Sequence, residues 1–142
     1  MAKNTTDLIA LGEEWFRKAP AIPANGREGL VKITPWVALV FGVLGIITGI
    51  GGLGVLTGSA AFGVLHSAGL GILSTLLFLA ASVLLLMAYP GTSKRQYRGW
   101  TLIFWSEVLV VLSNLVSFDI LGAVVGGLIG FYLLYQIKSY YK

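Results

Sequence analysis

The sequence has no cysteine and a single histidine, His66, among its 142 residues. Without cysteine the chain can form no disulfide, no thiolate metal site and no redox-active thiol pair. A lone histidine can ligate haem or chlorophyll, but no second ligand is visible, so we expect no cofactor. There is also no nucleophile with a base, no paired carboxylates and no metal-ligand spacing, and we therefore expect neither an enzyme nor a metal site.

Charged residues are also scarce. They make up 11% of the sequence against 56% for hydrophobic residues, and the mean hydropathy is +0.85, whereas soluble domains carry about 25% charged residues. The 61 residues from Ile33 to Ser93 include no Asp, Glu, Lys or Arg. This composition excludes a water-soluble globule and makes the lipid bilayer the expected partner. The net charge of +4 alone would suit a nucleic acid, but the placement of the charges favours a membrane, and we expect no nucleic-acid partner.

Four windows are long and apolar enough to cross a bilayer: 35–57, 69–89, 99–118 and 120–138. A helix needs about 20 apolar residues to cross about 30 Å of hydrocarbon, and it satisfies its own backbone groups there. Pro35 suits the first turn of the first helix, and residues 89–91, Tyr-Pro-Gly, are expected to end the second. Asp119 or Ser117 is the expected N-cap of the fourth. The sequence therefore predicts an all-α fold, with a four-helix transmembrane bundle over residues 35–142.

The positive charges predict how the chain is oriented. All ten lie outside the apolar part of the windows: Lys3, Arg17, Lys18, Arg27, Lys32, Lys94, Arg95, Arg98, Lys138 and Lys142. The two other connections, 58–68 and 117–119, carry none. Because Lys and Arg are enriched in cytoplasmic loops, we expect both termini and the loop between the second and third spans to be cytoplasmic.

Residues 1–34 are predicted to be a cytoplasmic amphipathic helix followed by a linker. Over residues 5–18 apolar side chains recur at helical spacing, with charged residues at the other positions; they are Leu8, Ile9, Leu11, Trp15 and Phe16. Pro20, Pro23 and the pair Asn25-Gly26 then end the helix. The helix either lies in the headgroup region of the membrane or docks on a partner protein, and we favour the first.

Glycines recur on two of the predicted spans. Gly122, Gly126 and Gly130 are four residues apart on the fourth, and Gly42, Gly45, Gly49 and Gly52 share one face of the first. Small residues let helix backbones approach closely in a bilayer. The two stripes are expected to pack against each other inside one bundle; the alternative is a contact between protomers of a homo-oligomer.

Glu107 is the only acidic residue inside a predicted span, about 12 Å along the third helix from Gly99. Together with Asn114, Ser106 and Ser113 it forms a candidate intramembrane polar site. An ionised carboxylate is costly at that depth, so we expect Glu107 to be neutral at pH 7 and to donate a hydrogen bond to another span. Candidate partners on the other spans are Thr48, Ser74, Thr75, Ser82 and Tyr132. The alternatives are a permeation or proton-coupling path, and lipid or pigment binding.

Three segments carry a resemblance to known proteins: residues 99–105 (GWTLIFW), 122–126 (GAVVG) and 132–141 (YLLYQIKSYY). They resemble uncharacterised small four-span membrane proteins of bacteria, mainly over the C-terminal half. The resemblance implies a bacterial inner membrane and brings no activity. Small multidrug transporters carry their essential Glu in the first span, where this chain has none, and the basic motif of fluoride channels is missing.

The absence of a catalytic set and the two glycine stripes predict a function. We expect a non-enzymatic multi-pass membrane protein, a structural or accessory subunit that packs its helices against itself or a membrane-complex partner. The alternative is a small oligomeric channel or proton-coupled transporter in which Glu107 and Asn114 line a polar path.

Overall fold

The computed structural model describes residues 5–61 and 68–142. Along them run α1 (Thr5–Phe16), α2 (Ala24–Ala61), α3 (Ala68–Ser93), α4 (Tyr97–Val116), α5 (Ile120–Ile137) and the 3-10 turn η1 (Lys138–Tyr140). These residues form no strand, so the predicted all-α fold is confirmed.

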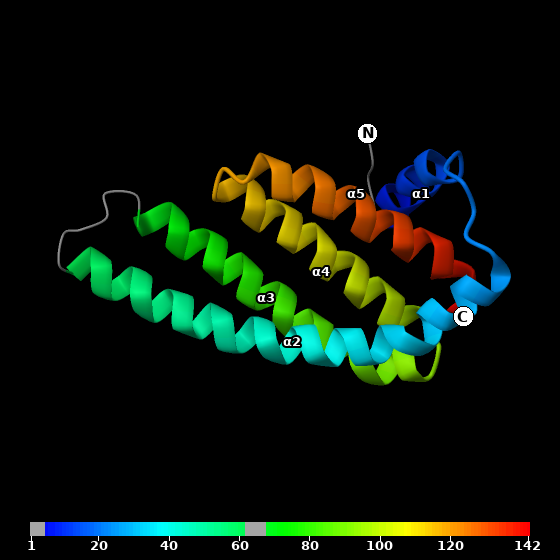
Figure 1. The fold of residues 1–142 in the computed structure, drawn as a ribbon, viewed down its shortest axis with the longest axis horizontal. Coiled ribbons are helices and arrows are strands. Elements are labelled where there is room, and N and C mark those ends of the chain that lie inside the picture. The colour runs from blue at the N-terminus through cyan, green and yellow to red at the C-terminus, as the bar shows by residue number, and fades with distance from the viewer. Residues whose placement is uncertain (1–4, 62–67) are drawn as a thin grey trace.

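Four of the helices are long and apolar enough to cross a membrane, over Ala24–Gly58, Gly69–Ser93, Tyr97–Val116 and Ile120–Tyr140. They lie side by side in chain order, so that α3 packs between α2 and α4, and α5 packs on the far side of α4 (Figure 1). Between α2 and α5 the contact is slight. In Figure 1, α2 and α3 extend past the turn that joins α4 to α5. The chain is a multi-pass integral membrane protein.

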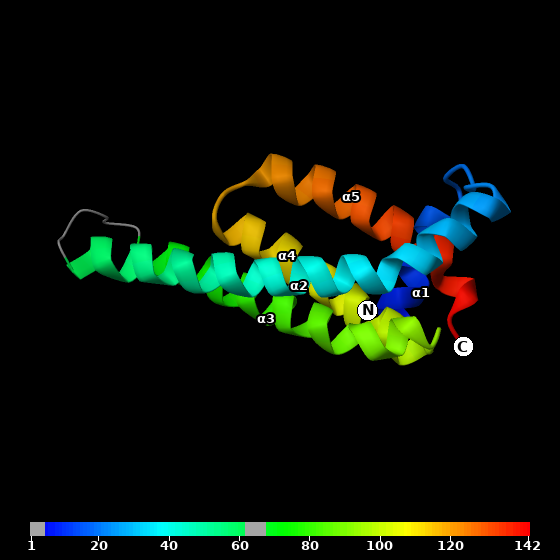
Figure 2. The ribbon, with the colours of Figure 1, turned by 60° about the horizontal axis from the view of Figure 1, so that its bottom comes forward.

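Two helix boundaries differ from the sequence prediction, and both involve proline. Pro35 was expected to open the first span, but α2 begins at Ala24 and contains Pro35. The second span was expected to stop at residues 89–91, but α3 continues through Pro90 to Ser93. Proline removes one intrahelical hydrogen bond, whereas ending a helix leaves four carbonyls without an intrahelical partner. Near hydrocarbon the continued helix is favoured, and in Figure 2 the first turns of α2 bend away from the rest.

The tight connection between α4 and α5 was predicted correctly. Asp119 is the N-cap of α5, and its side chain accepts a hydrogen bond from the backbone N–H of Gly122 at 2.8 Å. Ser117 is the C-cap of α4 instead. The N-cap satisfies one of the donors that the first helical turn leaves free, which lets two apolar helices reverse direction within three residues.

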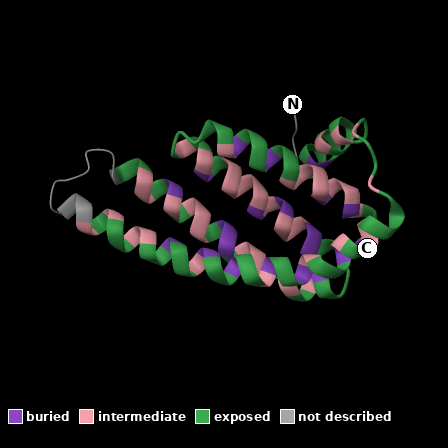
Figure 3. Cartoon of the chain, viewed as in Figure 1, coloured by how far each residue is buried: buried purple, intermediate pink, exposed green. Residues whose placement is uncertain are grey.

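Buried positions run along α3, α4 and α5 (Figure 3). At one end of the bundle, buried apolar side chains form a cluster. Its members come from α1, α2, α4, α5 and the C-terminal residues: Ile9, Val31, Trp100, Phe104, Leu134, Ile137 and Tyr141. We call this the basic end, because it also carries Lys94, Arg95, Arg98, Lys138 and Lys142. There the backbone N–H of Lys142 donates to the Arg95 carbonyl at 3.0 Å, and that of Tyr97 donates to the Lys142 carbonyl at 2.9 Å. These two bonds hold the C-terminal residues against the α3–α4 loop.

Helix α1 packs on α5 of its own chain. Ile9 is buried, and its carbonyl accepts a hydrogen bond from the Tyr135 hydroxyl at 3.0 Å. The ring of Phe16 stacks on that of Tyr135 with centroids 5.4 Å apart, and Glu13 forms an ion pair with Lys138. The remaining apolar face, with Leu8, Leu11 and Trp15, is exposed. That this exposed face lies among lipid headgroups stays a prediction.

Candidate functional site

The polar residues of α4 fall on two sides of the helix. Ser106 and Ser113 are buried and face α3, where Ser106 Oγ donates to the Ala81 carbonyl at 2.9 Å and Ser113 Oγ donates to the Ser74 carbonyl at 2.8 Å. Both hydroxyls are therefore used to join α4 to α3. A serine that bonds a neighbouring helix in this way stabilises packing and offers no open polar group to a ligand.

Glu107 faces α5. Its carboxyl group lies directly over Gly130, where the Cβ of any larger residue would collide with it. Glu107 is half-buried, and its carboxyl group forms no hydrogen bond with any residue in the described parts of the chain. Gly130 therefore has a specific role, which is to leave space for this carboxyl group between two helices.

None of the five expected partners hydrogen-bonds Glu107. Thr48, Ser74, Thr75 and Ser82 each donate to a carbonyl of their own helix, and the Tyr132 hydroxyl donates to the Pro20 carbonyl at 2.6 Å. The expectation that Glu107 is neutral stays a prediction. The expected bond to one of these spans is not formed.

Asn114 lies on the same side of α4 as Glu107, since residues seven apart share a helix face. It is half-buried, and its side-chain amide has no hydrogen-bond partner among the described residues. We call these two residues the Glu107–Asn114 face. The sequence grouped them with Ser106 and Ser113, but a shift of one residue turns a side chain by about 100°, so the four residues contact different neighbours.

The two glycine stripes do not pack against each other. On α2, Gly42, Gly45 and Gly49 lie against Leu86, Ser82 and Leu79 of α3. The stripe on α5 is divided, because Gly122 contacts the capping Asp119 and Gly130 contacts Glu107, whereas a Cβ added at Gly126 would meet no atom of another part of the chain within 4 Å. The α2 glycines thus serve packing inside the chain, and Gly126 is open.

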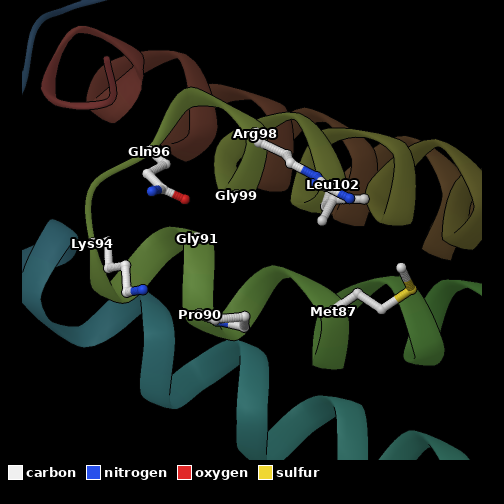
Figure 4. A pocket seen from close by; sticks show the side chains of 8 residues that line it. All are labelled: Met87, Pro90, Gly91, Lys94, Gln96, Arg98, Gly99 and Leu102. Atoms are coloured by element: carbon white, nitrogen blue, oxygen red, sulfur yellow. The ribbon is translucent and has the colours of Figure 1, made fainter.

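A pocket of about 230 Å³ lies at the α3–α4 loop (Figure 4). Its floor is the contact between Gly91 and Gly99, where the two helix backbones meet. Lys94 and Arg98 line it, but in Figure 4 their charged ends lie on different sides of the pocket. Arg95 points elsewhere and pairs with Glu28 of α2. The cations of this pocket do not converge on one point.

The remaining sequence predictions concern histidine and metals. His66 lies outside the described residues. Within the described parts of the chain, no three His, Cys, Asp or Glu side chains are grouped so as to hold a metal ion. Comparisons with family models, with curated proteins and with solved structures found no match to this chain.

Proposed function

We propose that this is a non-enzymatic membrane protein that acts by packing its helices against a membrane partner or a second copy of itself. The observation that carries the proposal is the Glu107–Asn114 face. Glu107 lies near the middle of α4 and Asn114 near its C-terminal end, and neither side chain has a hydrogen-bond partner among the described residues. Polar groups left unpaired in hydrocarbon are costly. A helix of another chain that supplies donors or acceptors would remove that cost.

Gly126 adds to this support. It lies one turn from Gly130 on α5, and a Cβ added there would meet no atom of another part of the chain within 4 Å. An open glycine on a membrane helix allows another backbone to come close, and close approach strengthens both packing and interhelical hydrogen bonds. We infer that the partner helix lies along α5 beside the Glu107–Asn114 face.

The second candidate is an oligomeric channel or proton-coupled transporter that uses Glu107 and Asn114. The same unpaired side chains favour it. Against it, Ser106 and Ser113 are already bonded to α3, so each chain would contribute only two polar side chains to a path. We therefore place it second.

Association in a bilayer tests the proposal. Copies with donor and acceptor dyes are reconstituted into liposomes, and energy transfer is measured as the protein is diluted in lipid. Glu107→Leu and Gly126→Leu are each expected to weaken association about tenfold, the size of one lost interhelical contact. Glu107→Gln keeps a hydrogen-bonding group and should associate normally. Gly51→Leu is the matched control, because a Cβ added at Gly51 would also meet no atom of another part of the chain within 4 Å, but Gly51 lies on α2.

Two results would count against helix packing. One is a wild-type chain that stays monomeric at high density and also forms no adduct from a photo-crosslinker at position 114 in native membranes. The other is a proton flux into the same liposomes that disappears in Glu107→Gln, which would favour the transporter.

For the orientation, we propose that both termini and the α3–α4 loop face the cytoplasm of a bacterial inner membrane. Support comes from the cations at the basic end and the positive-inside rule. Because the native chain has no cysteine, single cysteines report sidedness with a membrane-impermeant thiol reagent. Phe118→Cys, in the α4–α5 turn, should be labelled in intact cells, and Gln96→Cys only after lysis. The reverse pattern would refute this orientation.

A further inference from the structure

Two adjoining pockets lie where α1 and the α1–α2 linker pack on α4 and α5. The first, of about 300 Å³, is lined by apolar and aromatic side chains, among them Leu8, Phe104, Val108 and Phe131. The second, of about 200 Å³, is lined by polar and charged side chains, among them Arg17, Arg27 and Gln136. Both are lined by the stacked rings of Phe16 and Tyr135. The rings thus form a shared wall between an apolar and a cationic compartment.

The two pockets follow one another along the C-terminal part of the chain, from α5 into η1. Phe131, Tyr135 and Ser139 lie four residues apart along the C-terminal part of the chain, and each marks one level: the apolar pocket, the shared wall and the polar pocket. Four helical residues rise about 6 Å. The apolar pocket therefore lies deeper in the span, and the cationic pocket lies at the basic end, as expected for a site that holds an amphiphile with its head at the surface.

The charge in the polar pocket is positive. Glu13 also lines it, but its carboxylate is paired with Lys138. Among the described residues, neither Arg17 nor Arg27 forms an ion pair. The Nε–H of Arg27 is buried and has no hydrogen-bond partner in the described chain. A buried donor on a charged group is costly to leave unpaired, and an anionic oxygen is the acceptor that a guanidinium binds best.

The chain holds these arginines in place. The linker between α1 and α2 is fixed to α5, because the Tyr132 hydroxyl donates to the Pro20 carbonyl and the backbone N–H of Ile22 donates to Gln136 Oε1 at 3.1 Å. Arg17 follows α1 directly, and Arg27 lies in the first turn of α2. Two segments that flank a tethered linker thus bring two guanidinium groups to one pocket.

We propose that the paired pockets bind one anionic glycerophospholipid of the surrounding leaflet, with its phosphate at Arg17 and Arg27 and an acyl chain between α1 and α4. The apolar pocket alone would accept many hydrophobic groups. The adjoining cations and the unpaired Arg27 Nε–H select an occupant with an apolar chain and a negative head. This site is distinct from the Glu107–Asn114 face, because neither Glu107 nor Asn114 lines the two pockets.

Native mass spectrometry of the full chain in a neutral detergent tests the proposal. Phosphatidylglycerol and phosphatidylcholine with identical acyl chains are titrated separately. The chain is expected to prefer phosphatidylglycerol, and the pair Arg17→Gln with Arg27→Gln is expected to weaken its binding about thirtyfold and to remove the preference. The pair Lys94→Gln with Arg98→Gln is the matched control, because it removes the same charge from the pocket whose cations do not converge; it should bind as the wild type does.

Further arms distinguish the occupants. Val108→Phe fills the apolar pocket and is expected to weaken phosphatidylglycerol binding. If circular dichroism shows that this variant does not fold, Leu8→Trp at the exposed rim of the pocket is used in its place. Inorganic phosphate should not displace the lipid. The proposal is overturned by equal binding of both lipids, by an equal loss in the Lys94 and Arg98 control, by displacement with phosphate, or by normal binding in the filled variants.

Discussion

Replacement of Trp100 by alanine is expected to lower the free energy of unfolding by about 3 to 5 kcal/mol, the usual range for loss of a large buried aromatic side chain. Trp100 is fully buried, and its indole Nε1–H donates to the Leu134 carbonyl of α5 at 2.8 Å. Its ring also packs on those of Phe104 and Tyr135. The change therefore leaves a cavity and an unpaired carbonyl at the place where α4, α5 and α1 meet.

Unfolding in mixed micelles, followed by circular dichroism, measures this effect. Trp36→Ala is the matched control, because Trp36 is 61% exposed and its loss creates no cavity; it should unfold close to the wild type. Trp100→Phe retains much of the ring volume and loses the hydrogen bond, so an intermediate stability is expected. If the alanine variants at 36 and 100 unfold alike, the core does not depend on Trp100.

Gly99→Ala is expected to destabilise the α3–α4 pair by about 3 kcal/mol, at the upper end for overpacking. A Cβ at Gly99 would collide with backbone atoms of Gly91 and Thr92. Side chains can rotate away from a new methyl group, but a helix backbone can move only if the two helices separate. The added methyl group would therefore force apart the backbones of α3 and α4 where they meet at the α3–α4 loop.

The control for this variant is Gly51→Ala, where the added methyl group meets no atom within 4 Å. Alanine is favoured over glycine inside a helix by roughly 0.5–1 kcal/mol, so this variant should unfold at the same denaturant concentration as the wild type or a higher one. Equal stability of the two variants would show that the backbones at Gly91 and Gly99 can separate without loss.

The spans were predictable because they depend on a property of whole segments. A long apolar run without charge must be a helix in a bilayer, and the hydropathy of the sequence places α2 to α5. The helix boundaries at Pro35 and Pro90 were not predictable in this way. In water a helix can end at proline because water then hydrogen-bonds the freed backbone groups, but near hydrocarbon no water is present to do so, and the helix continues despite the one lost hydrogen bond.

Which side of a helix meets which neighbour was harder to predict. In α1 two sets of apolar residues recur at helical spacing, and the structure buries Ile9 while leaving Leu8 and Leu11 exposed; the pattern alone is compatible with either. In α4, Ser106 and Ser113 each precede a member of the Glu107–Asn114 face by one residue. That difference of one residue determines that the serines face α3 and that Glu107 faces α5. The cationic pocket was missed because Arg17 and Arg27 are separated in sequence and meet only through the tethered linker.

The helices of this protein differ in length, so they match different thicknesses of the bilayer. At 1.5 Å per residue, the 38 residues of α2 measure about 57 Å and the 18 residues of α5 about 27 Å. A bilayer with a hydrocarbon core of about 30 Å matches α5 and leaves the far part of α2, with exposed Ile50 and Val55, beyond its apolar layer unless α2 tilts. Either α2 tilts, or the lipids around the α2–α3 side stretch while those around α5 stay relaxed, and the second response favours the thicker regions of a membrane.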